Sequence, residues 1–257
     1  MDYYADFAAN YDCVLPEGAL DASFVGITSP GSISLIQRVL DDLNPGSSVL
    51  DCACGIGLDA LALARSGFRV TASDGSKAMI NEARKRFRDS GVQVTAVHSE
   101  WVDLPTKLQG PFDLVLCTGN SIAHASSKTA MIGSLRSMHS VLRPNGLLIV
   151  DSRNWEALYR TRPRIMVSPR MTRKDGNKCA WVYVWTIPRD FTEPCRAEIV
   201  ILLEGRDETL SHEYFTLEFK PFSFDDLILS TVSAGFEVVD TSYASSNPFY
   251  GILAQSK

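Results

Sequence analysis

Between residues 47 and 153, short apolar runs alternate with segments of helical periodicity. The apolar runs have the length of buried strands and lie at 48–54, 68–74, 92–97, 112–118 and 147–152. This alternation predicts βαβ units and an α/β fold with a doubly wound parallel sheet. A ligand of such a sheet binds beyond the carboxyl ends of the strands, where the strand order reverses.

Two helices of this region carry clear apolar faces. One places Met79, Ala83 and Phe87 at helical spacing, after the second apolar run. The other precedes the fifth run and is expected to carry four residues on one face, namely Met131, Leu135, Met138 and Leu142. A turn at 144–146 (Pro-Asn-Gly) should separate this helix from the strand at 147–152.

After residue 153 the pattern changes. Strand-like runs at 179–187, 196–204 and 209–220 follow, and the last two are joined by a probable hairpin at 205–208. A helix at 224–233 and strands at 236–240 and 250–254 return to the α/β pattern. We therefore predict one domain over 1–257 in four parts: an N-terminal cap (1–46), a ligand-binding core (47–153), an antiparallel insertion or lid (154–222) and a completion of the sheet (223–257).

Composition excludes several classes of function. The 257 residues carry a net charge of −5, which argues against a nucleic-acid partner held by bulk electrostatics. No apolar run approaches the ~18 residues of a membrane span, and residues 1–6 lack the pattern of a secretion signal, so we expect a cytoplasmic protein. The six cysteines form no CxxC pair, which favours buried thiols and no metal site. Composition leaves open whether the chain forms a homo-oligomer.

A glycine loop follows the first predicted strand. Gly55 and Gly57 fit G-x-G-x-x-A before a helix, and Asp74 ends the second strand, nineteen residues after Gly55. Dinucleotide sites and S-adenosyl-L-methionine (SAM) sites share this pattern. Asp51, at the end of the first strand, should face the loop, where it would repel a pyrophosphate and stabilise the ammonium and sulfonium of SAM. Asp51 therefore favours SAM, and Asp74 suits the ribose hydroxyls of either cofactor.

The runs at 50–57 (LDCACGIG) and 72–79 (ASDGSKAM) resemble the class I SAM-dependent methyltransferases. Two further runs, at 119–124 (GNSIAH) and 151–155 (DSRNW), resemble signatures of the glycine and glycine/sarcosine N-methyltransferases. The resemblance covers about 1–155, and more loosely 209–236. It implies a Rossmann-like methyltransferase sheet in which the 47–153 core binds SAM and releases S-adenosyl-L-homocysteine.

The resemblance also implies roles for single residues at the cofactor. Trp101 and Met79 take the positions that pack against the two faces of adenine, and Tyr11 belongs to a leading segment, with Tyr3 and Tyr4, that caps the SAM pocket. The remaining positions implied at the cofactor are Asp51, Cys54, Gly55, Gly57, Asp74, Gly75, Glu100 and Thr118.

Three residues are candidates for the acceptor side. Arg153 follows the fifth strand, where a guanidinium can clamp the carboxylate of a small amino acid. Asn120 follows the fourth strand and could bond the carboxylate or amine of the substrate, although Asn after glycine is also a common turn former. His124 is a candidate to accept a proton, and a helix-start histidine satisfied by backbone is the alternative.

The chain departs from the vertebrate glycine enzymes. A tyrosine pair used near their substrate is replaced here by the stretch 170–173 (RMTR), so that role does not carry over. Trp181, Tyr183 and Trp185 alternate along a strand instead and share one face. We expect them to wall the substrate pocket by cation–π contact, worth roughly 0.5–2 kcal/mol each, or else to pack the insertion onto the sheet.

These observations predict a SAM-dependent N-methyltransferase that acts on glycine, sarcosine or a related amino acid, toward dimethylglycine or betaine. Three alternatives stay open. The fold could methylate oxygen or carbon of another small carboxylate, it could be a nicotinamide oxidoreductase, or it could be a non-catalytic module with the basic run 160–178 as a partner surface.

Overall fold

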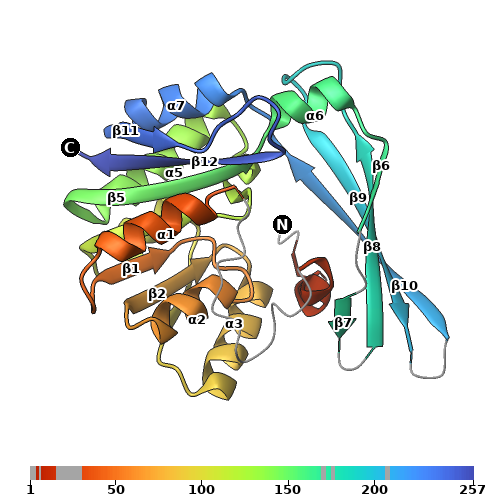
Figure 1. The fold of residues 1–257 in the computed structure, drawn as a ribbon, viewed down its shortest axis with the longest axis horizontal. Helices are drawn as coiled ribbons and strands as arrows, with labels where there is room; N and C mark the ends of the chain where they lie inside the picture. Colours follow the sequence, from red (N-terminus) through yellow and green to blue (C-terminus); the bar gives the residue numbers. More distant parts are fainter. Residues whose placement is uncertain (1–3, 6, 16–30, 169–171, 175–176, 206–208) are drawn as a thin grey trace.

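Two sheets form the framework of the molecule (Figure 1). The computed structural model describes residues 4–5, 7–15, 31–168, 172–174, 177–205 and 209–257. In this part of the chain, one sheet has seven strands in the order β11-β12-β5-β4-β1-β2-β3, and the other has the order β10-β9-β8-β6, with β7 paired to β8.

The seven-stranded sheet is doubly wound. Strands β1 to β5 run parallel, and β12 runs antiparallel to both β5 and β11. The order reverses between β1 and β4, so the carboxyl ends of these strands flank the switch point. The predicted α/β class is confirmed. The strand bounds are β1 (Ser48–Asp51), β2 (Arg69–Asp74), β3 (Thr95–His98), β4 (Phe112–Cys117), β5 (Leu142–Arg153), β11 (Phe236–Thr241) and β12 (Phe249–Ser256).

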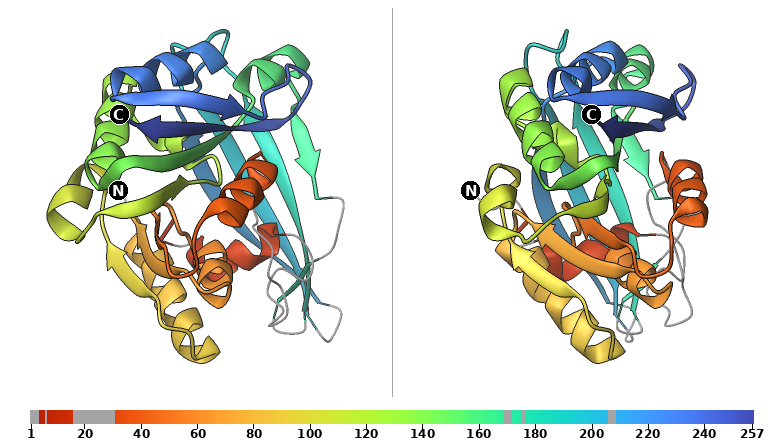
Figure 2. Two further views of the ribbon diagram at one scale, coloured as in Figure 1. Left: turned by 60° about the vertical axis from the view of Figure 1, so that its left-hand side comes forward. Right: turned by 90° about the vertical axis from the view of Figure 1, so that its left-hand side faces the viewer.

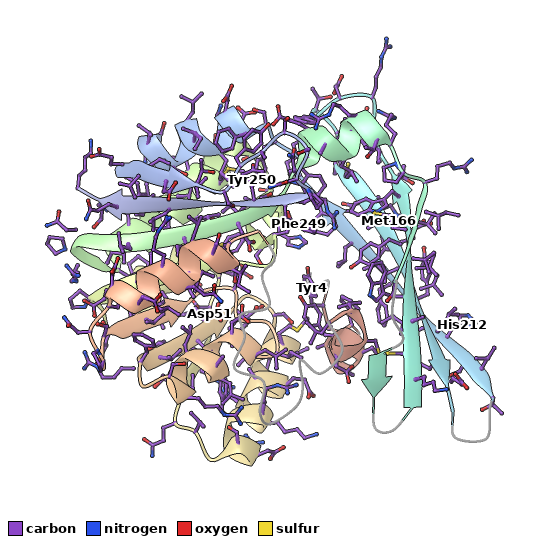
Figure 3. All side chains as sticks on the ribbon, viewed as in Figure 1. Tyr4, Asp51, Met166, His212, Phe249 and Tyr250 are labelled. Carbon is purple, nitrogen blue, oxygen red and sulfur yellow. The ribbon has the colours of Figure 1, made fainter. Side chains whose placement is uncertain are left out.

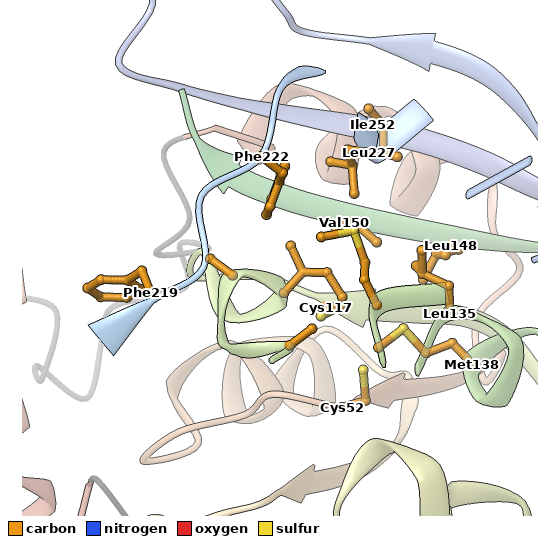
Figure 4. Close-up of a cluster of buried hydrophobic side chains, with 14 of the residues drawn as sticks. Cys52, Cys117, Leu135, Met138, Leu148, Val150, Phe219, Phe222, Leu227 and Ile252 are labelled. Carbon is orange, nitrogen blue, oxygen red and sulfur yellow. The ribbon is translucent and has the colours of Figure 1, made fainter. Parts of the chain in front are cut away.

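Helices cover both faces of this sheet (Figure 2). On one face, apolar side chains of α1 (Ile33–Asp42), α2 (Leu58–Arg65) and α3 (Lys77–Ser90) pack against the strands. On the other face, α4 (Leu104–Lys107), α5 (Lys128–Ser140) and α7 (Phe224–Ser233) do so. Figure 4 shows part of this second cluster, where Leu135 and Leu227 meet Val150 of β5. The two-sided burial explains why the strands read as continuous apolar runs.

The second sheet follows β5. Helix α6 (Trp155–Thr161) leads into antiparallel strands β6 (Ile165–Val167), β7 (Thr172–Lys174), β8 (Asn177–Thr186), β9 (Cys195–Glu204) and β10 (Leu210–Phe219). The predicted antiparallel insertion is confirmed, whereas β6 and β7 were not predicted. Residues 206–208 of the predicted hairpin lie outside the described part of the chain. The Gly205 amide donates to the Thr209 carbonyl across it, at 2.9 Å.

A 3-10 helix, η1 (Ala8–Val14), lies between the two sheets (Figure 1). Its neighbour Phe7 packs against Phe215 of β10, with ring centroids 4.8 Å apart. Of the predicted cap 1–46, residues 1–3, 6 and 16–30 lie outside the described part, and these include Tyr3. The division into cap, core and lid stays a prediction.

Leu142 and residues 144–146 correct the prediction. Leu142 does not extend α5 but begins β5, where it pairs with Phe112. The expected turn at 144–146 is an irregularity inside β5, with Asn145 at φ 61°, and the pairing register shifts beside it. The strand ladder with β4 therefore outweighs the helical spacing of Leu142. The first strand ends at Asp51 rather than Cys54, and the third begins at Thr95 rather than Val92.

Two further expectations concern the whole chain. All six cysteines lie in the described part of the chain, where each is buried and none forms a disulfide. Within the described ranges, every helix is too short or too polar to reach across a bilayer.

Candidate functional site

A cavity of about 630 Å³ opens at the carboxyl ends of β1, β2 and β4. Its volume falls in the range of small-molecule and cofactor sites. Gly55, Asp74 and Trp101 line it, together with Tyr4 and Tyr11 from the N-terminal segment. A larger open groove of about 760 Å³ lies between α3 and the strands β2 and β3, but it contains none of the predicted site residues. The first cavity is therefore the candidate site.

The glycine loop and Asp74 form one backbone-held unit. The Asp74 carboxylate accepts from the amides of Gly55 and Ser76, both at 2.8 Å. Gly55 and Gly57 both have positive φ, and a Cβ on Gly57 would stand 2.7 Å from the Phe87 ring. Gly57 therefore permits the close packing of α2 on α3 rather than lining the cavity. The arrangement fixes a carboxylate at the cavity wall, where it can accept further hydrogen bonds from hydroxyl groups.

Asp51 is almost fully buried, with 1% of its surface exposed. Burial and the neighbouring Asp59 and Asp74 carboxylates raise the pKa of Asp51 well above its usual range. The ion pairs of the described residues do not include it, and the Ala53 amide donates to its carboxylate at 3.4 Å. Asp51 does not itself line the cavity. A buried acid without a cation favours a positively charged ligand group nearby.

Two apolar side chains stand where an aromatic ligand ring could pack. Met79 of α3 is 2% exposed and Trp101 begins η2 (Trp101–Asp103); both line the cavity. The Trp101 indole donates to the Cys52 carbonyl at 2.8 Å, which fixes the plane of its ring. Glu100 and Gly75 lie against each other at the same wall, because a Cβ on Gly75 would stand 3.1 Å from the Glu100 carboxylate.

Two predicted cofactor residues lie behind the cavity wall. Cys54 is buried, and its Sγ lies 3.6 Å from the Gly55 carbonyl. Thr118 is buried after β4, and its carbonyl accepts from the Ser121 hydroxyl at 2.7 Å. The geometry gives both residues a part in shaping the loops, and neither side chain lines the cavity.

His124 and Tyr4 meet at the cavity. His124 ends η3 (Ser121–His124), and its Nε2 lies 2.8 Å from the Tyr4 hydroxyl. The His124 ring also hydrogen-bonds the backbone of Glu218. Burial lowers the pKa of His124 to about 4, because the backbone contact only partly offsets desolvation. His124 is therefore neutral at pH 7 and a weak base.

Arg153 carries a guanidinium that two aromatic rings flank. It is the last residue of β5, and its guanidinium lies 4.6 Å from the Phe249 ring centroid and 5.2 Å from that of Trp185. Burial lowers the pKa of Arg153, and its buried Nε has no hydrogen-bond partner among the described residues. The ion pairs found in that part of the chain do not include Arg153. A partly buried guanidinium whose Nε lacks a partner favours an anionic ligand.

Asn120 holds the end of β5. Its Oδ1 accepts from the Arg153 amide at 2.9 Å and from the Ser152 hydroxyl at 3.1 Å, while its own amide donates to Asp151 at 2.9 Å. Asn120 has φ 63°, so the turn-former interpretation describes its backbone. Because its side-chain oxygen is already used, only its amide NH₂ remains as a donor toward a ligand.

The aromatic residues of β8 lie beside Arg153. The Tyr183 ring stacks on Trp185, with centroids 5.8 Å apart, and meets Trp181 edge-on at 4.9 Å. The 3-10 helix η1 connects this group to the cavity, because it contacts β8 and its Tyr11 lines the cavity. Figure 3 shows Tyr4 and Phe249 between the α/β core and the antiparallel sheet. Arg153, Trp181 and Tyr183 thus adjoin the cavity through η1 and do not line it.

Sequence reasoning missed part of the cavity wall. Phe219 and Lys220, at the end of the insertion, line it, and the Lys220 amide donates to the Ala123 carbonyl at 2.7 Å. No spacing in the sequence signals this contact between distant segments. Ser76 also lines the cavity and caps α3, a role that serine immediately before a helix could have signalled.

The basic run 160–178 is described only in part. Arg160 donates to the Ser245 carbonyl, and Arg162 donates to the carbonyls of Ile187 and Pro188. Residues 169–171 and 175–176, with Arg170 among them, lie outside the described part of the chain. Arg160 therefore joins α6 to the loop between β11 and β12, and Arg162 joins the end of α6 to the segment after β8.

Comparison with known proteins now adds to this geometry. Residues 49–146 match the methyltransferase domain family. Glycine/sarcosine N-methyltransferase of Aphanothece halophytica is 36% identical over 110 residues, which are 43% of this chain and 42% of that protein. Glycine N-methyltransferase of Homo sapiens is 33% identical over 126 residues, which are 44% and 43% of the two chains. The match spans less than half the length of these curated relatives.

Solved structures share the fold over most of the chain. Streptomyces venezuelae DesVI has a TM-score of 0.72 at 20% identity and covers 87% of this chain and 90% of its own. An S-adenosylmethionine-dependent methyltransferase from Clostridium acetobutylicum has a TM-score of 0.69 at 17% identity and covers 86% and 89%. This chain therefore contains a methyltransferase domain at residues 49–146, set in the fold of the class I SAM-dependent methyltransferases.

Proposed function

We propose that this chain is a SAM-dependent N-methyltransferase whose acceptor is the amine of a small amino acid such as glycine or sarcosine. The observation that carries the proposal is Arg153, a guanidinium whose buried Nε lacks a hydrogen-bond partner in the described structure. It lies near a cavity that Asp74 lines, and the buried Asp51 carboxyl close to Asp74 also suits a cationic nucleoside. An amino acid supplies both the carboxylate for Arg153 and the amine that receives the methyl group.

The cavity fits the cofactor. Asp74 would hold the ribose hydroxyls, Met79 and Trp101 would enclose the adenine, and Asp51 would favour the positive charge. When bound, SAM supplies an activated methyl group on a sulfonium. The raised pKa of Asp51 is consistent with this use, because a cation beside a buried carboxyl lowers that pKa again. A pyrophosphate near Asp51 would instead raise the pKa of this carboxyl further, because like charges repel.

Arg153 would bind and orient the acceptor. Phe249 and Trp185 hold the guanidinium plane between them, so a carboxylate can approach its edge in a bidentate manner. Asn120 holds the backbone of Arg153 in place and can offer its NH₂ group to the acceptor. Fixing an acceptor amine at a near-attack distance of ~3–3.5 Å contributes up to about 7–11 kcal/mol to such reactions.

Among the residues described at the cavity, the candidate base is His124, and it is a weak one. An amine must be neutral to accept a methyl group, and the pKa of His124, about 4, makes it a poor proton acceptor at pH 7. The Tyr4 hydroxyl also occupies the Nε2 of His124. We therefore infer that the acceptor amine loses its proton to solvent, and that the rate rises with pH toward the pKa of the amine itself.

The names of the matched relatives support this substrate class, since they are glycine and glycine/sarcosine N-methyltransferases. The match covers less than half of each chain. The preferred acceptor and the number of methyl groups therefore rest on the site geometry and on experiment.

The test is product analysis by mass spectrometry. The full chain is incubated with methyl-deuterated SAM and, separately, with glycine, sarcosine, dimethylglycine, glycolate and buffer alone. We expect labelled methyl groups on the amine of at least one of the first three acceptors and none on glycolate. Glycolate keeps the carboxylate and offers a hydroxyl in place of the amine, so labelled glycolate would indicate an O-methyltransferase.

Calorimetric titration separates the remaining alternatives. We expect SAM to bind and NAD to give no heat beyond dilution. Binding of NAD in place of SAM would indicate an oxidoreductase. Binding of SAM without transfer to any acceptor would contradict the proposed substrate class.

A further inference from the structure

The antiparallel sheet has an apolar face that points away from the rest of the chain. Its inner face carries Trp185, Ile199 and Phe215, which are buried against the core. Because side chains alternate along a strand, the intervening residues point to the opposite side. We call that side the outer apolar face, and it consists of Ile165, Val167, Val182, Val200, Leu202 and Tyr214.

Strand register brings these residues together. Tyr214, Val200 and Val182 are successive cross-strand partners on β10, β9 and β8, and Val167 of β6 continues the row. Leu202 belongs to the next row, opposite His212, which Figure 3 shows on the side of the sheet away from Tyr4. The six residues therefore form one patch that crosses four strands.

Large apolar side chains of this patch are exposed to solvent. The exposed fractions are 62% for Ile165, 59% for Val167, 54% for Tyr214 and 42% for Leu202. These are four of the ten large apolar side chains that are exposed in the described part of the chain. Contiguous apolar patches on soluble proteins mark interaction sites, because leaving them in water costs free energy that a partner recovers.

Charges at the two ends of the strands narrow the choice of partner. Arg196 forms an ion pair with Glu198 at 3.2 Å at one end, and Lys178 stands opposite Glu204 at the other. Both signs are thus present at each end. A nucleic acid or an anionic membrane would be repelled by the carboxylates at either end. The same face of a second copy offers a charge of opposite sign for each charged end, and an apolar centre for the apolar centre.

The size of the face suits self-association. The whole outer side of β8, β9 and β10, with the outer apolar face at its centre and charges at its ends, extends about 33 Å by 14 Å, or roughly 460 Å² before side-chain relief is counted. Each partner of a standard interface contributes about 800 Å², which the face approaches with its relief and with β6. Two sheets pack face to face about 10 Å apart with interdigitated side chains.

We propose that a second copy of this chain covers the outer apolar face, so that two antiparallel sheets form a two-fold symmetric sandwich. In such an isologous contact the centre of the face lies near the symmetry axis. Val200, in the middle of β9, therefore meets the same region of the other copy. The inner face of the same sheet lies toward Arg153 within each subunit and takes no part in this contact. The candidate site of each subunit therefore remains accessible in the dimer.

The test measures mass in solution, independently of enzyme activity. Sedimentation velocity of the full chain at micromolar concentration should give twice the 28.3 kDa of one chain. Val200→Glu places like charges against each other in a desolvated contact, and we expect self-association to weaken by about a hundredfold or more. Val239→Glu is the matched control, since Val239 is 49% exposed on β11 of the other sheet and should leave the dimer intact.

Circular dichroism checks that the variants are folded. Should Val200→Glu not fold, Leu202→Lys makes the same test from an exposed position on the same strand. A monomeric native chain would overturn the proposal, whether or not some other protein binds the face. A dimer whose dissociation constant is unchanged by both outer-face substitutions would overturn it too.

Discussion

The two sides of the candidate site are built in different ways. The cofactor side, around Gly55, Asp74 and Trp101, is held by backbone groups and by short-range contacts within the α/β core. The acceptor side, around Arg153, joins the end of β5 to Trp185 of the second sheet and to Phe249 of β12. The first is formed by the consecutive elements from β1 to η2, and the second exists only when more distant segments have docked.

The two sides also carry opposite unpaired charges. Burial raises the pKa of Asp51 and lowers that of Arg153, and neither forms an ion pair among the described residues. Each charge is costly in its buried setting until a ligand of opposite sign arrives. This contrast supports the proposal of two ligands, with a cationic cofactor on one side and an anionic acceptor on the other.

The largest expected effect tests the acceptor side. In Arg153→Ala we expect kcat/KM for the amino-acid acceptor to fall by roughly 100- to 1000-fold, because a buried charge pair is lost on binding. The dissociation constant for SAM, measured by calorimetry, should change by less than about twofold. Arg153→Lys should fall between, since it keeps the charge and loses the planar fork. Arg136→Ala, at an exposed position on α5, is the control. If Arg153→Ala lost SAM affinity by the same factor as kcat/KM for the acceptor, the two sides of the site would not be distinct.

The next effect concerns His124, which lies where the two sides meet. Its pKa is about 4 in the folded chain, below the ordinary 6.5. As pH falls below 6.5, the unfolded chain binds a proton at His124 that the folded chain does not bind. The free energy of unfolding therefore decreases between pH 6.5 and 4, and above pH 6.5 this residue causes no loss. We expect a loss of up to about 3 kcal/mol in the free energy of unfolding by urea.

His124→Gln should remove most of this pH dependence, since glutamine does not titrate and can still bond the Tyr4 hydroxyl. The same variant tests the chemistry. If activity of the native chain showed a break near pH 6.5 that vanished in His124→Gln, the histidine would be the base after all.

A smaller effect is expected on the cofactor side. Asp74→Asn removes the charge that would accept the ribose hydroxyls while keeping the side-chain shape. We expect the SAM dissociation constant to rise by about 10- to 50-fold, in line with the loss of charge-assisted hydrogen bonds. At saturating SAM, the KM for the acceptor should stay within about twofold. An acceptor KM that rises as much as the SAM constant would show that the two sides are not separable.

The smallest effect concerns the aromatic residues of β8. Trp181→Ala should raise the KM of a methylated acceptor such as sarcosine by about 2- to 10-fold, as expected for one cation–π contact. Trp181 is only partly buried, so it can be replaced with less disturbance than the buried Trp185. Unchanged affinity together with an unchanged number of transferred methyl groups would leave these residues a packing role only.

Sequence reasoning reached the cofactor side further than the acceptor side. The loop at Gly55 and the carboxylate of Asp74 are nineteen residues apart and belong to one strand–helix–strand unit, so their spacing alone predicts their contact. The role of Gly57 in packing α2 on α3 needed the structure, because its neighbour Phe87 lies thirty residues away. The position of Leu142 was wrong, because pairing with Phe112 overrides its helical spacing.

The amino-acid sequence by itself determined the α/β class, the strand ends that carry Asp51 and Asp74, and the antiparallel insertion, because hydrophobic periodicity and loop residues encode local structure. Only the tertiary structure decided that Arg153 lies between Trp185 and Phe249 with no ion pair among the described residues. It also decided that the Tyr4 hydroxyl bonds His124, and that the second sheet exposes an apolar face. Each of these depends on contacts between segments that are far apart in the chain. Burial, pairing and exposure are properties of such contacts, so no local pattern can carry them.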